Sequence, residues 1–251
     1  MSSMALSSIV FACVCASALL GMGLRRVLPE HHLSDDSKET VKLGVGLVST
    51  MAALVLGLLV ASAKSSFDTR STELTQIAAN IVLLDRVLAH YGPETSEIRI
   101  ILRRSVALMI NRIWPQGSTE ATNLDPLTVS GETLYDKIQA LSPRNDLQRS
   151  LKAKALSLGV NVAETRWLLF AQSGSAIPTP FLIVLAFWLC VIFVSIGLFA
   201  PQNSTVAVTL FLSALSVSTA IFLILELDRS FQGILQVSSA PLTNALARLG
   251  Q

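Results

Sequence analysis

Four long apolar segments without a charged residue or a histidine constrain this chain more than any other feature. They cover residues 4–24, 43–63, 180–200 and 204–225. A helix needs about 20 apolar residues to cross the hydrocarbon core of a bilayer, and inside lipid its backbone must satisfy its own hydrogen bonds. The segments therefore predict four membrane-spanning helices, of which the first is diluted by serine and cysteine.

The first segment has a rival interpretation as a secretory signal peptide. Its basic pair, Arg25 and Arg26, follows the apolar run, whereas the basic region of a signal peptide precedes the apolar run. No small-residue cleavage motif leads from this segment into a polar mature domain. We therefore expect the segment to be retained as a span.

Composition supports a membrane protein and excludes several soluble classes. Hydrophobic residues make up 51% of the chain and charged residues 14%, against about 25% charged residues in ordinary soluble domains. The net charge of +2 is too balanced for a dedicated nucleic-acid-binding protein. The three cysteines, Cys13, Cys15 and Cys190, lie inside apolar segments, so neither a disulfide framework nor a zinc site is expected.

The positions of the polar stretches give the predicted domain organisation. Residues 1–64 hold spans one and two, 65–178 an extramembrane helical insert, 179–226 spans three and four, and 227–251 a tail with a short helix. No segment shows the alternation typical of a strand. The predicted fold class is all-α: a four-span helical membrane protein with a helical bundle inserted between spans two and three.

The charges beside the spans do not fix the orientation. An even number of spans puts both termini and the insert on one side of the membrane. That side carries Lys64, Arg70, Arg166 and Arg229 near the spans, and the opposite side carries Arg25, Arg26, Lys38 and Lys42. Because the two sides are balanced, the positive-inside rule does not choose between them.

One helix is predicted to continue far beyond the second span. Asp36 and Glu39 have the spacing of a capping box, so the helix should begin near Ser37, and Gly92 before Pro93 should end it. The helix would have about 55 residues and a length of about 80 Å, of which the span needs about 30 Å. The rest carries an apolar stripe that indicates packing on neighbouring helices or, alternatively, a self-associating coiled coil. The stripe comprises Leu74, Ile77, Ile81, Leu84, Leu88 and Tyr91.

Shorter helices are predicted around this long one. Pro93 should begin a helix that ends near Trp114, and residues 115–131 have the composition of a loop. Ser142 and Pro143 should be the N-cap and first residue of a helix that leads towards the third span. A terminal helix is expected over residues 239–249.

Two polar clusters beside the spans have residue types that bind or sense ions. Glu30, His31 and His32, with Asp35, could ligate a metal or respond to pH near neutrality, or could form a solvated loop. The other cluster, directly after the fourth span, comprises Glu226, Asp228 and Arg229. It could be an interfacial salt bridge, because Glu226 and Arg229 are three residues apart, or an ion-binding or gating site.

The second span carries small residues along one face. This small-residue stripe comprises Gly46, Thr50, Ala53, Gly57 and Ala61. Such a face allows close helix packing, or it could line the pore of an oligomer. Lys64 follows where the span leaves the bilayer. In an oligomer it would form a basic ring that attracts anions, and otherwise it is an interfacial lysine that reaches water.

Motifs of soluble enzymes are absent from the sequence. There is no glycine-rich phosphate loop, nucleophile elbow or His-Glu-x-x-His motif. We therefore do not expect an enzyme. A metal-dependent membrane enzyme that uses Glu30, His31, His32 and Asp35 is the least favoured hypothesis.

Several sequence runs resemble one family of membrane proteins. They are LPEHHLS at residues 28–34, KLG at 42–44, ALVLGLLVASAKSSFD at 53–68, ELDRSF at 226–231 and SSAPL at 238–242. In this order and over nearly the whole chain, they resemble the bestrophin-like integral membrane proteins. Most members are bacterial and have no assigned function.

The resemblance carries expectations from the bestrophins, which are pentameric anion channels. It implies a pore lined by the second span, with termini and insert in the cytoplasm and the protein in the cell membrane. An acidic cluster after the fourth span binds calcium in animal members, and Glu226 and Asp228 stand at the comparable place. The chain departs from that pattern in two ways. Its cluster has two acids and Arg229 instead of a longer acidic run, and its second span offers Thr50, Ala53 and Gly57, whereas bestrophin necks carry bulky apolar and aromatic residues.

Two functions remain after this comparison. The leading hypothesis is a passive, chloride-type anion channel formed by a homo-oligomer, with a pentamer favoured. Its partners would be the bilayer, its own copies and small anions, with no nucleic acid. It needs no cofactor, apart from a calcium ion that the resemblance allows. The alternative is a non-conducting membrane scaffold or sensor whose helical insert binds a partner.

Overall fold

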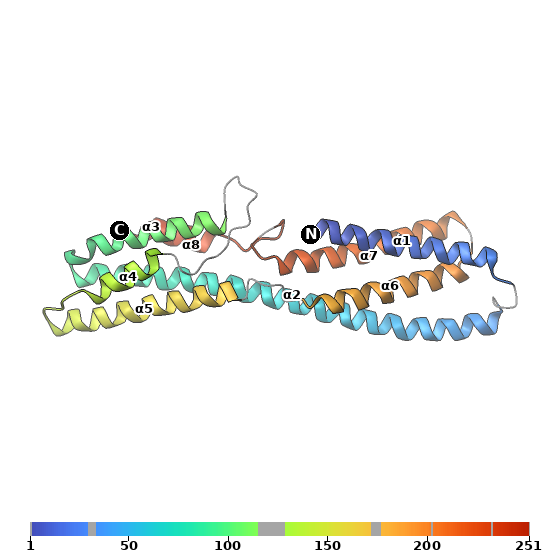
Figure 1. Ribbon diagram of the computed structural model, residues 1–251, viewed down its shortest axis with the longest axis horizontal. Coiled ribbons are helices and arrows are strands. Elements are labelled where there is room, and N and C mark those ends of the chain that lie inside the picture. Colours follow the sequence, from blue (N-terminus) through green and yellow to red (C-terminus); the bar gives the residue numbers. More distant parts are fainter. Residues whose placement is uncertain are drawn as a thin grey trace. The chain divides into compact units, whose positions relative to one another are not determined.

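The computed structural model describes residues 2–29, 34–114, 129–171, 177–201, 203–231 and 233–250. Within these ranges the chain is helical and contains no strand, which confirms the predicted all-α class (Figure 1). The helices are α1 (Ser3–Val27), α2 (Asp35–Tyr91), the 3-10 helix η2 (Pro93–Thr95), α3 (Ser96–Ile113), α4 (Val129–Gln139), α5 (Asp146–Ala171), α6 (Thr179–Phe199), α7 (Ser204–Asp228) and α8 (Ala240–Arg248).

The chain divides into two compact units. The first unit comprises Met1–Ser66 and Ser175–Leu235, and the second comprises Phe67–Gly174 and Gln236–Gln251. Helix α2 contributes its first part to the first unit and its remainder to the second. The C-terminal residues from Gln236 onwards belong with the second unit.

The first unit contains four helices that are long and apolar enough to cross a membrane. They are α1, α2, α6 and α7, and each covers one of the four predicted spans. Helix α1 packs on α6 and α7, and Phe11 meets Phe211 edge-to-face at a centroid distance of 5.5 Å. The buried core of this unit also takes in Ala52, Leu59 and Ala63 from one side of α2.

Helices α1 and α6 approach each other to backbone contact at two glycines. A Cβ atom on Gly21 of α1 would overlap the carbonyl oxygen of Val194, and one on Gly197 of α6 would overlap the carbonyl oxygen of Ala18. Both glycines are buried. Small residues let two helix backbones approach this closely. Such packing matters in a membrane because lipid supplies no hydrophobic drive for helix association.

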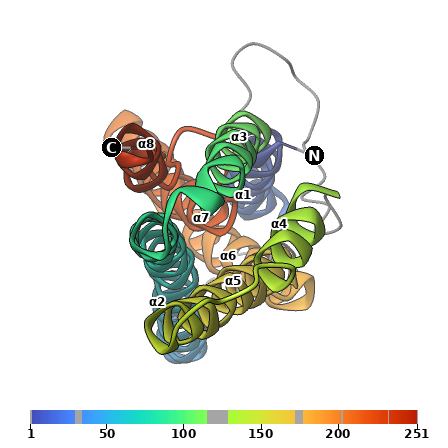
Figure 2. The same ribbon diagram turned by 90° about the vertical axis from the view of Figure 1, so that its left-hand side faces the viewer.

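The second unit is a helical bundle around the later part of α2. Figure 2 shows α4 between α3 and α5, with α8 on the other side of α3. The predicted apolar stripe of α2 is confirmed as core, because all six of its residues are at most 4% exposed. Gly92 ends α2 with φ of +138°, and the Thr95 hydroxyl lies 2.6 Å from the carbonyl oxygen of Leu88, which closes the turn into α3.

The long helix has the predicted length and end but a different N-cap. Helix α2 has 57 residues, against the predicted 55 or so, and ends one residue before Gly92. It begins at Asp35, and the hydroxyl of Ser34 accepts a hydrogen bond from the Ser37 amide at 3.4 Å. The predicted cap at Asp36 is therefore wrong, because a serine two residues earlier already supplies an acceptor for the first turn.

The start predicted for the helix that leads to the third span is also wrong. Helix α5 begins at Asp146, and the side-chain oxygen of Asn145 accepts from the Gln148 amide at 2.7 Å. Asparagine is as good an N-cap as serine, so Asn145 replaces Ser142 in that role. Most of the predicted loop, residues 115–128, lies outside the described residues, and α4 begins at Val129.

Candidate functional site

The small-residue stripe of α2 is uncovered within this chain. Gly46, Thr50, Ala53, Gly57, Ala61 and Lys64 are all exposed. At 3.6 residues per turn they lie on roughly the opposite side of the helix from the buried Ala52, Leu59 and Ala63. The stripe therefore faces away from the core of its own unit.

The two glycines of the stripe have open space beside them. A Cβ atom on Gly46 or Gly57 would meet no heavy atom within 4 Å. This contrasts with Gly21 and Gly197, where the neighbouring helix lies against the backbone. Close packing of the stripe on a helix of the same chain is therefore wrong as an explanation for its small residues. A pore lining and a contact with another copy both remain.

The rest of the exposed side of this helix is bulky and apolar. Within the predicted span its large exposed side chains are Leu43, Leu47, Met51, Leu54, Leu58 and Val60. Leu47, Met51, Leu54 and Leu58 form a line beside the stripe, whereas Leu43, seven residues before Thr50, shares the face of the stripe. The hydroxyl of Thr50 donates to the carbonyl of Gly46 at 3.0 Å, so its hydrogen is used within the helix and its lone pairs face outward. Apart from Lys64, Thr50 is the only hydrogen-bonding side chain in the stripe.

The Glu226 cluster forms the C-terminal end of α7, and Glu226 bonds to its own chain. Glu226 and Asp228 are buried, with 4% and 8% exposure, and Arg229 caps the end of α7. One carboxylate oxygen of Glu226 accepts a hydrogen bond from the Ile234 amide at 2.7 Å. This contact folds the segment after α7 back onto the helix end.

The Glu226 loop depends on a glycine in the left-handed region. Gly233 has φ of +106°, and a Cβ atom there would overlap the Glu226 carboxylate. Across the described ranges no group of three or more His, Cys, Asp or Glu side chains is placed to hold a metal. Glu226 therefore has a structural role that the sequence did not indicate.

Replacing Gly233 with alanine should loosen this loop. The new side chain would strain the backbone and displace the Glu226 carboxylate, at a cost of about 1–2 kcal/mol. We expect faster hydrogen exchange at the Ile234 amide and a lower unfolding temperature of the purified protein. Gly159→Ala is the matched control, because a Cβ there meets nothing within 4 Å. Unchanged protection of Ile234 in Gly233→Ala would contradict the assignment.

The remaining predicted ion-binding cluster is only partly described. Glu30, His31 and His32 lie outside the described residues, and Asp35 is the exposed first residue of α2. One of the eight basic residues counted near the spans, Arg25, has a structural role that its charge alone does not indicate. A guanidinium nitrogen of Arg25 donates to the carbonyl oxygen of Ala200 at the end of α6, which places a cation at a helix C-terminus.

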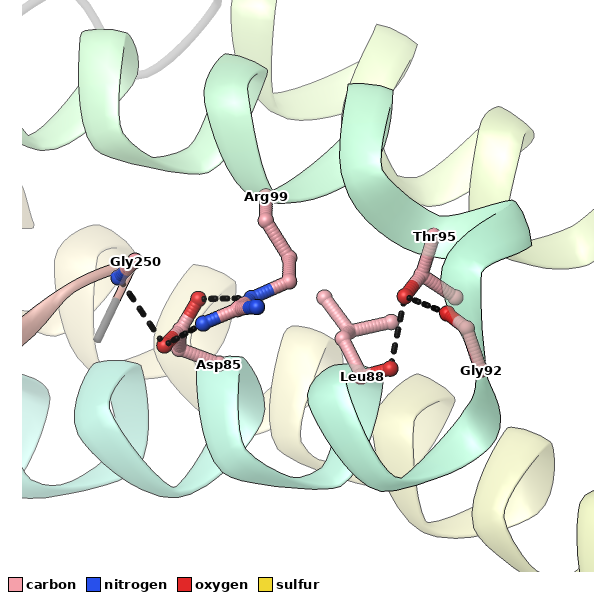
Figure 3. A network of polar contacts seen from close by, with 6 residues as sticks. All are labelled: Asp85, Leu88, Gly92, Thr95, Arg99 and Gly250. Carbon is pink, nitrogen blue, oxygen red and sulfur yellow. Dashed lines mark hydrogen bonds and ion pairs between the residues drawn. The ribbon is translucent and has the colours of Figure 1, made fainter.

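The second unit holds a buried ion pair that was not among the sites predicted from the sequence. Asp85 on α2 is 1% exposed, and its two oxygens accept from Nε and a terminal nitrogen of Arg99 on α3 at 2.7 and 2.9 Å (Figure 3). The Gly250 amide donates to the same carboxylate at 3.3 Å. The sequence does contain a signal for this pair. Asp85 and Arg99 are each seven residues from Gly92, and residues at equal distances from the turn of a helical hairpin face each other.

The surroundings of Asp85 favour its charged form. Burial by itself would raise the pKa of this carboxyl group. The hydrogen bonds from Arg99 and Gly250, with the positive charges of Arg99 and Arg86, outweigh burial and hold the pKa below its ordinary value. The same hydrogen bond raises the pKa of Arg99.

Together these features define an all-α membrane protein with four apolar helices and a second helical unit. Residues 12–242 match the family model of the Bestrophin-like domain. That match covers most of the chain, so the chain belongs to the bestrophin-like family, which confirms the resemblance found in the sequence. Searches of curated proteins and of solved structures found no match.

Proposed function

We propose that this protein is an anion channel of the chloride type, formed by several copies of the chain and driven only by the electrochemical gradient. The observation that carries the proposal is the small-residue stripe of α2, which is exposed along the whole predicted span and is not used for packing within the chain. Membership of a family related to the bestrophins, which include anion channels, supports the same function.

The chemistry of the stripe suits a narrow, weakly binding pore. Glycine and alanine leave the helix surface close to the backbone, and Thr50, whose hydroxyl hydrogen is donated to Gly46, adds no strong anion-binding group. A pore of this kind conducts where it is wide enough to stay wet and closes by dewetting where it narrows. Lys64, one turn beyond Ala61 on the same face, would form a ring of positive charge that concentrates anions at the mouth.

A single chain cannot enclose such a pore, because its four apolar helices leave the stripe on the outside. The proposal therefore requires a homo-oligomer, and a ring of five copies is favoured. We place the protein in the cell membrane with its termini and the second unit in the cytoplasm. Calcium is not part of the proposed mechanism, because Glu226 is held by its own loop.

Anion flux into liposomes tests the pore. Gly57→Leu should reduce the flux of the purified protein at least about tenfold, because a leucine in every copy would narrow and dry the pore. Gly44→Leu is the matched control: Gly44 is exposed, has nothing within 4 Å and lies on the same helix but off the stripe. Equal flux in the two variants would contradict the pore assignment. No flux above empty vesicles at any pH or divalent concentration would refute the channel.

The number of subunits is the measurement to make before the flux assay. Native mass spectrometry of the detergent-purified protein should give one discrete ring-forming state. A monomer or a dimer would remove the central pore from consideration.

One observation supports the alternative of a non-conducting scaffold or sensor. The second unit, outside the apolar spans, carries exposed Ile100, Leu108 and Leu147, each more than half exposed. A partner of the insert would bury such side chains, and that is the contact this function requires. A ring-forming oligomer without anion flux would favour this function over the channel.

A further inference from the structure

The C-terminal segment from Gln236 to Gly250 is held on the second unit by apolar contacts and hydrogen bonds. Its helix α8 has nine residues and buries Leu242 and Ala245, and the segment also buries Val237 before the helix and Leu249 after it. Helix α8 packs on α3. Isolated helices of this length are not stable in water, so α8 stays folded only while it is docked.

Polar anchors lie at the two ends of this segment. The indole nitrogen of Trp114, at the end of α3, donates to the carbonyl oxygen of Val237 at 3.2 Å. At the other end, the Gly250 amide donates to Asp85 (Figure 3). The segment is therefore fixed by a hydrogen bond near each end and by four buried apolar side chains, Val237, Leu242, Ala245 and Leu249.

Asp85 and Arg99 would remain paired if the segment left. Arg99 makes two hydrogen bonds to Asp85, at 2.7 and 2.9 Å, and neither involves the C-terminal segment. Detachment would therefore break one hydrogen bond to Asp85 without leaving its charge buried and unpaired. Loss of the Asp85 carboxylate has a larger effect than detachment of the segment, because it removes the hydrogen-bond acceptor of both Arg99 and Gly250. Detaching the segment therefore costs less free energy than separating α2 from α3.

We propose that residues 236–250 form a strap that docks on and detaches from the α2–α3 hairpin as one unit, and that the Asp85 carboxylate holds its end in place. The strap directly follows the loop that Glu226 closes after α7. Its docked or released state thus sets how much free chain follows that last apolar helix. The strap is independent of the channel proposal, since it concerns only the folding of the second unit.

Hydrogen exchange of the full-length protein in detergent tests the strap. The amide of Thr243 donates to the carbonyl of Ser239 at the start of α8, and the amide of Leu249 donates to the carbonyl of Ala245 at its end, so both amides report on docking. They should exchange at least about tenfold faster than the buried turns of α3 around Leu102 and Val106, because local opening costs less than global unfolding. In Asp85→Asn the α8 amides should exchange faster still.

Two further variants separate the strap from general destabilisation. Gly250 has φ of +86°, so Gly250→Ala strains the end of the strap and leaves the Asp85–Arg99 pair intact. It should speed exchange of α8 several-fold and leave α3 unchanged. Asp146→Asn, which removes an exposed ion pair with Arg149, is the control and should change neither helix.

The proposal is overturned if α8 and α3 exchange at the same rate and respond to Gly250→Ala by the same factor, since the segment would then be an inseparable part of the bundle. It is also overturned if Gly250→Ala leaves α8 exchange unchanged. If Asp85→Asn fails to fold, Gly250→Ala still decides between these outcomes.

Discussion

Gly21→Ala should destabilise the first unit by about 2–3 kcal/mol, although it adds only one methyl group. In the structure that methyl would overlap the backbone oxygen of Val194 on α6. Backbone cannot move aside as a flexible side chain can, so α1 and α6 must separate along their contact. Gly197→Ala should have a similar effect, because it would meet the backbone of Ala18 from the opposite side.

Thermal unfolding of the detergent-purified protein measures this effect, and we expect a midpoint lower by about 5 °C or more. Gly23→Ala is the control on the same helix, two residues away. A Cβ there meets nothing within 4 Å, and alanine in a helix is up to about 1 kcal/mol more stable than glycine. If Gly21→Ala and Gly23→Ala unfold at the same temperature, the close contact between α1 and α6 is wrong.

Asp85→Ala should lower the free energy of unfolding of the second unit by about 2–3 kcal/mol. Removing one partner of a fully buried ion pair costs about 3–5 kcal/mol, because the remaining charge is left without a counter-ion. The expected loss is smaller here because the Arg99 side chain keeps 21% of its exposure and can still reach water. Asp146→Ala, which removes an exposed pair, should cost no more than about 0.5 kcal/mol.

Chemical denaturation, monitored through a signal from the second unit, measures this loss of stability. Lowering the pH should cause the same loss in the parent protein. The pKa of Asp85 is lower in the folded than in the unfolded chain. The stabilisation is therefore complete above the unfolded pKa of about 3.9 and is lost as the pH falls through the folded pKa. The stability difference between the parent and Asp85→Ala should shrink below about pH 4. A difference that stays constant down to pH 2 would show that the charge of Asp85 is not involved.

Much of the fold could be predicted because the relevant signals are local in the sequence. Charge-free runs give the four spans, and a glycine followed by a proline ends α2 at Tyr91 as expected. The buried stripe of α2 follows from apolar spacing alone. The N-caps were less predictable: Ser34 and Asn145 compete with Asp36 and Ser142, and several residues near a helix start can supply the acceptor.

The candidate site was predicted in part. The residues of the small-residue stripe share a face because a helix repeats every 3.6 residues, and this needs no tertiary information. Whether that face is buried within the chain could not be predicted, since glycines pack closely in α1 and α6 but not in α2. The grouping of Glu226 and Asp228 was expected from the sequence, but the bond from Ile234 to Glu226 depends on how the next eight residues turn.

The sequence by itself determined that this is a helical membrane protein of the bestrophin-like family, because hydropathy and family motifs are properties of residue order. The tertiary structure decided which glycines hold helices together, which face of α2 stays uncovered and which acid is bound by the C-terminal segment. Asp85 and Gly250 are 165 residues apart, and nothing in either local sequence indicates that they meet. Contacts of that kind depend on how the whole bundle packs, because a hydrogen bond forms only between groups that the fold has already brought together.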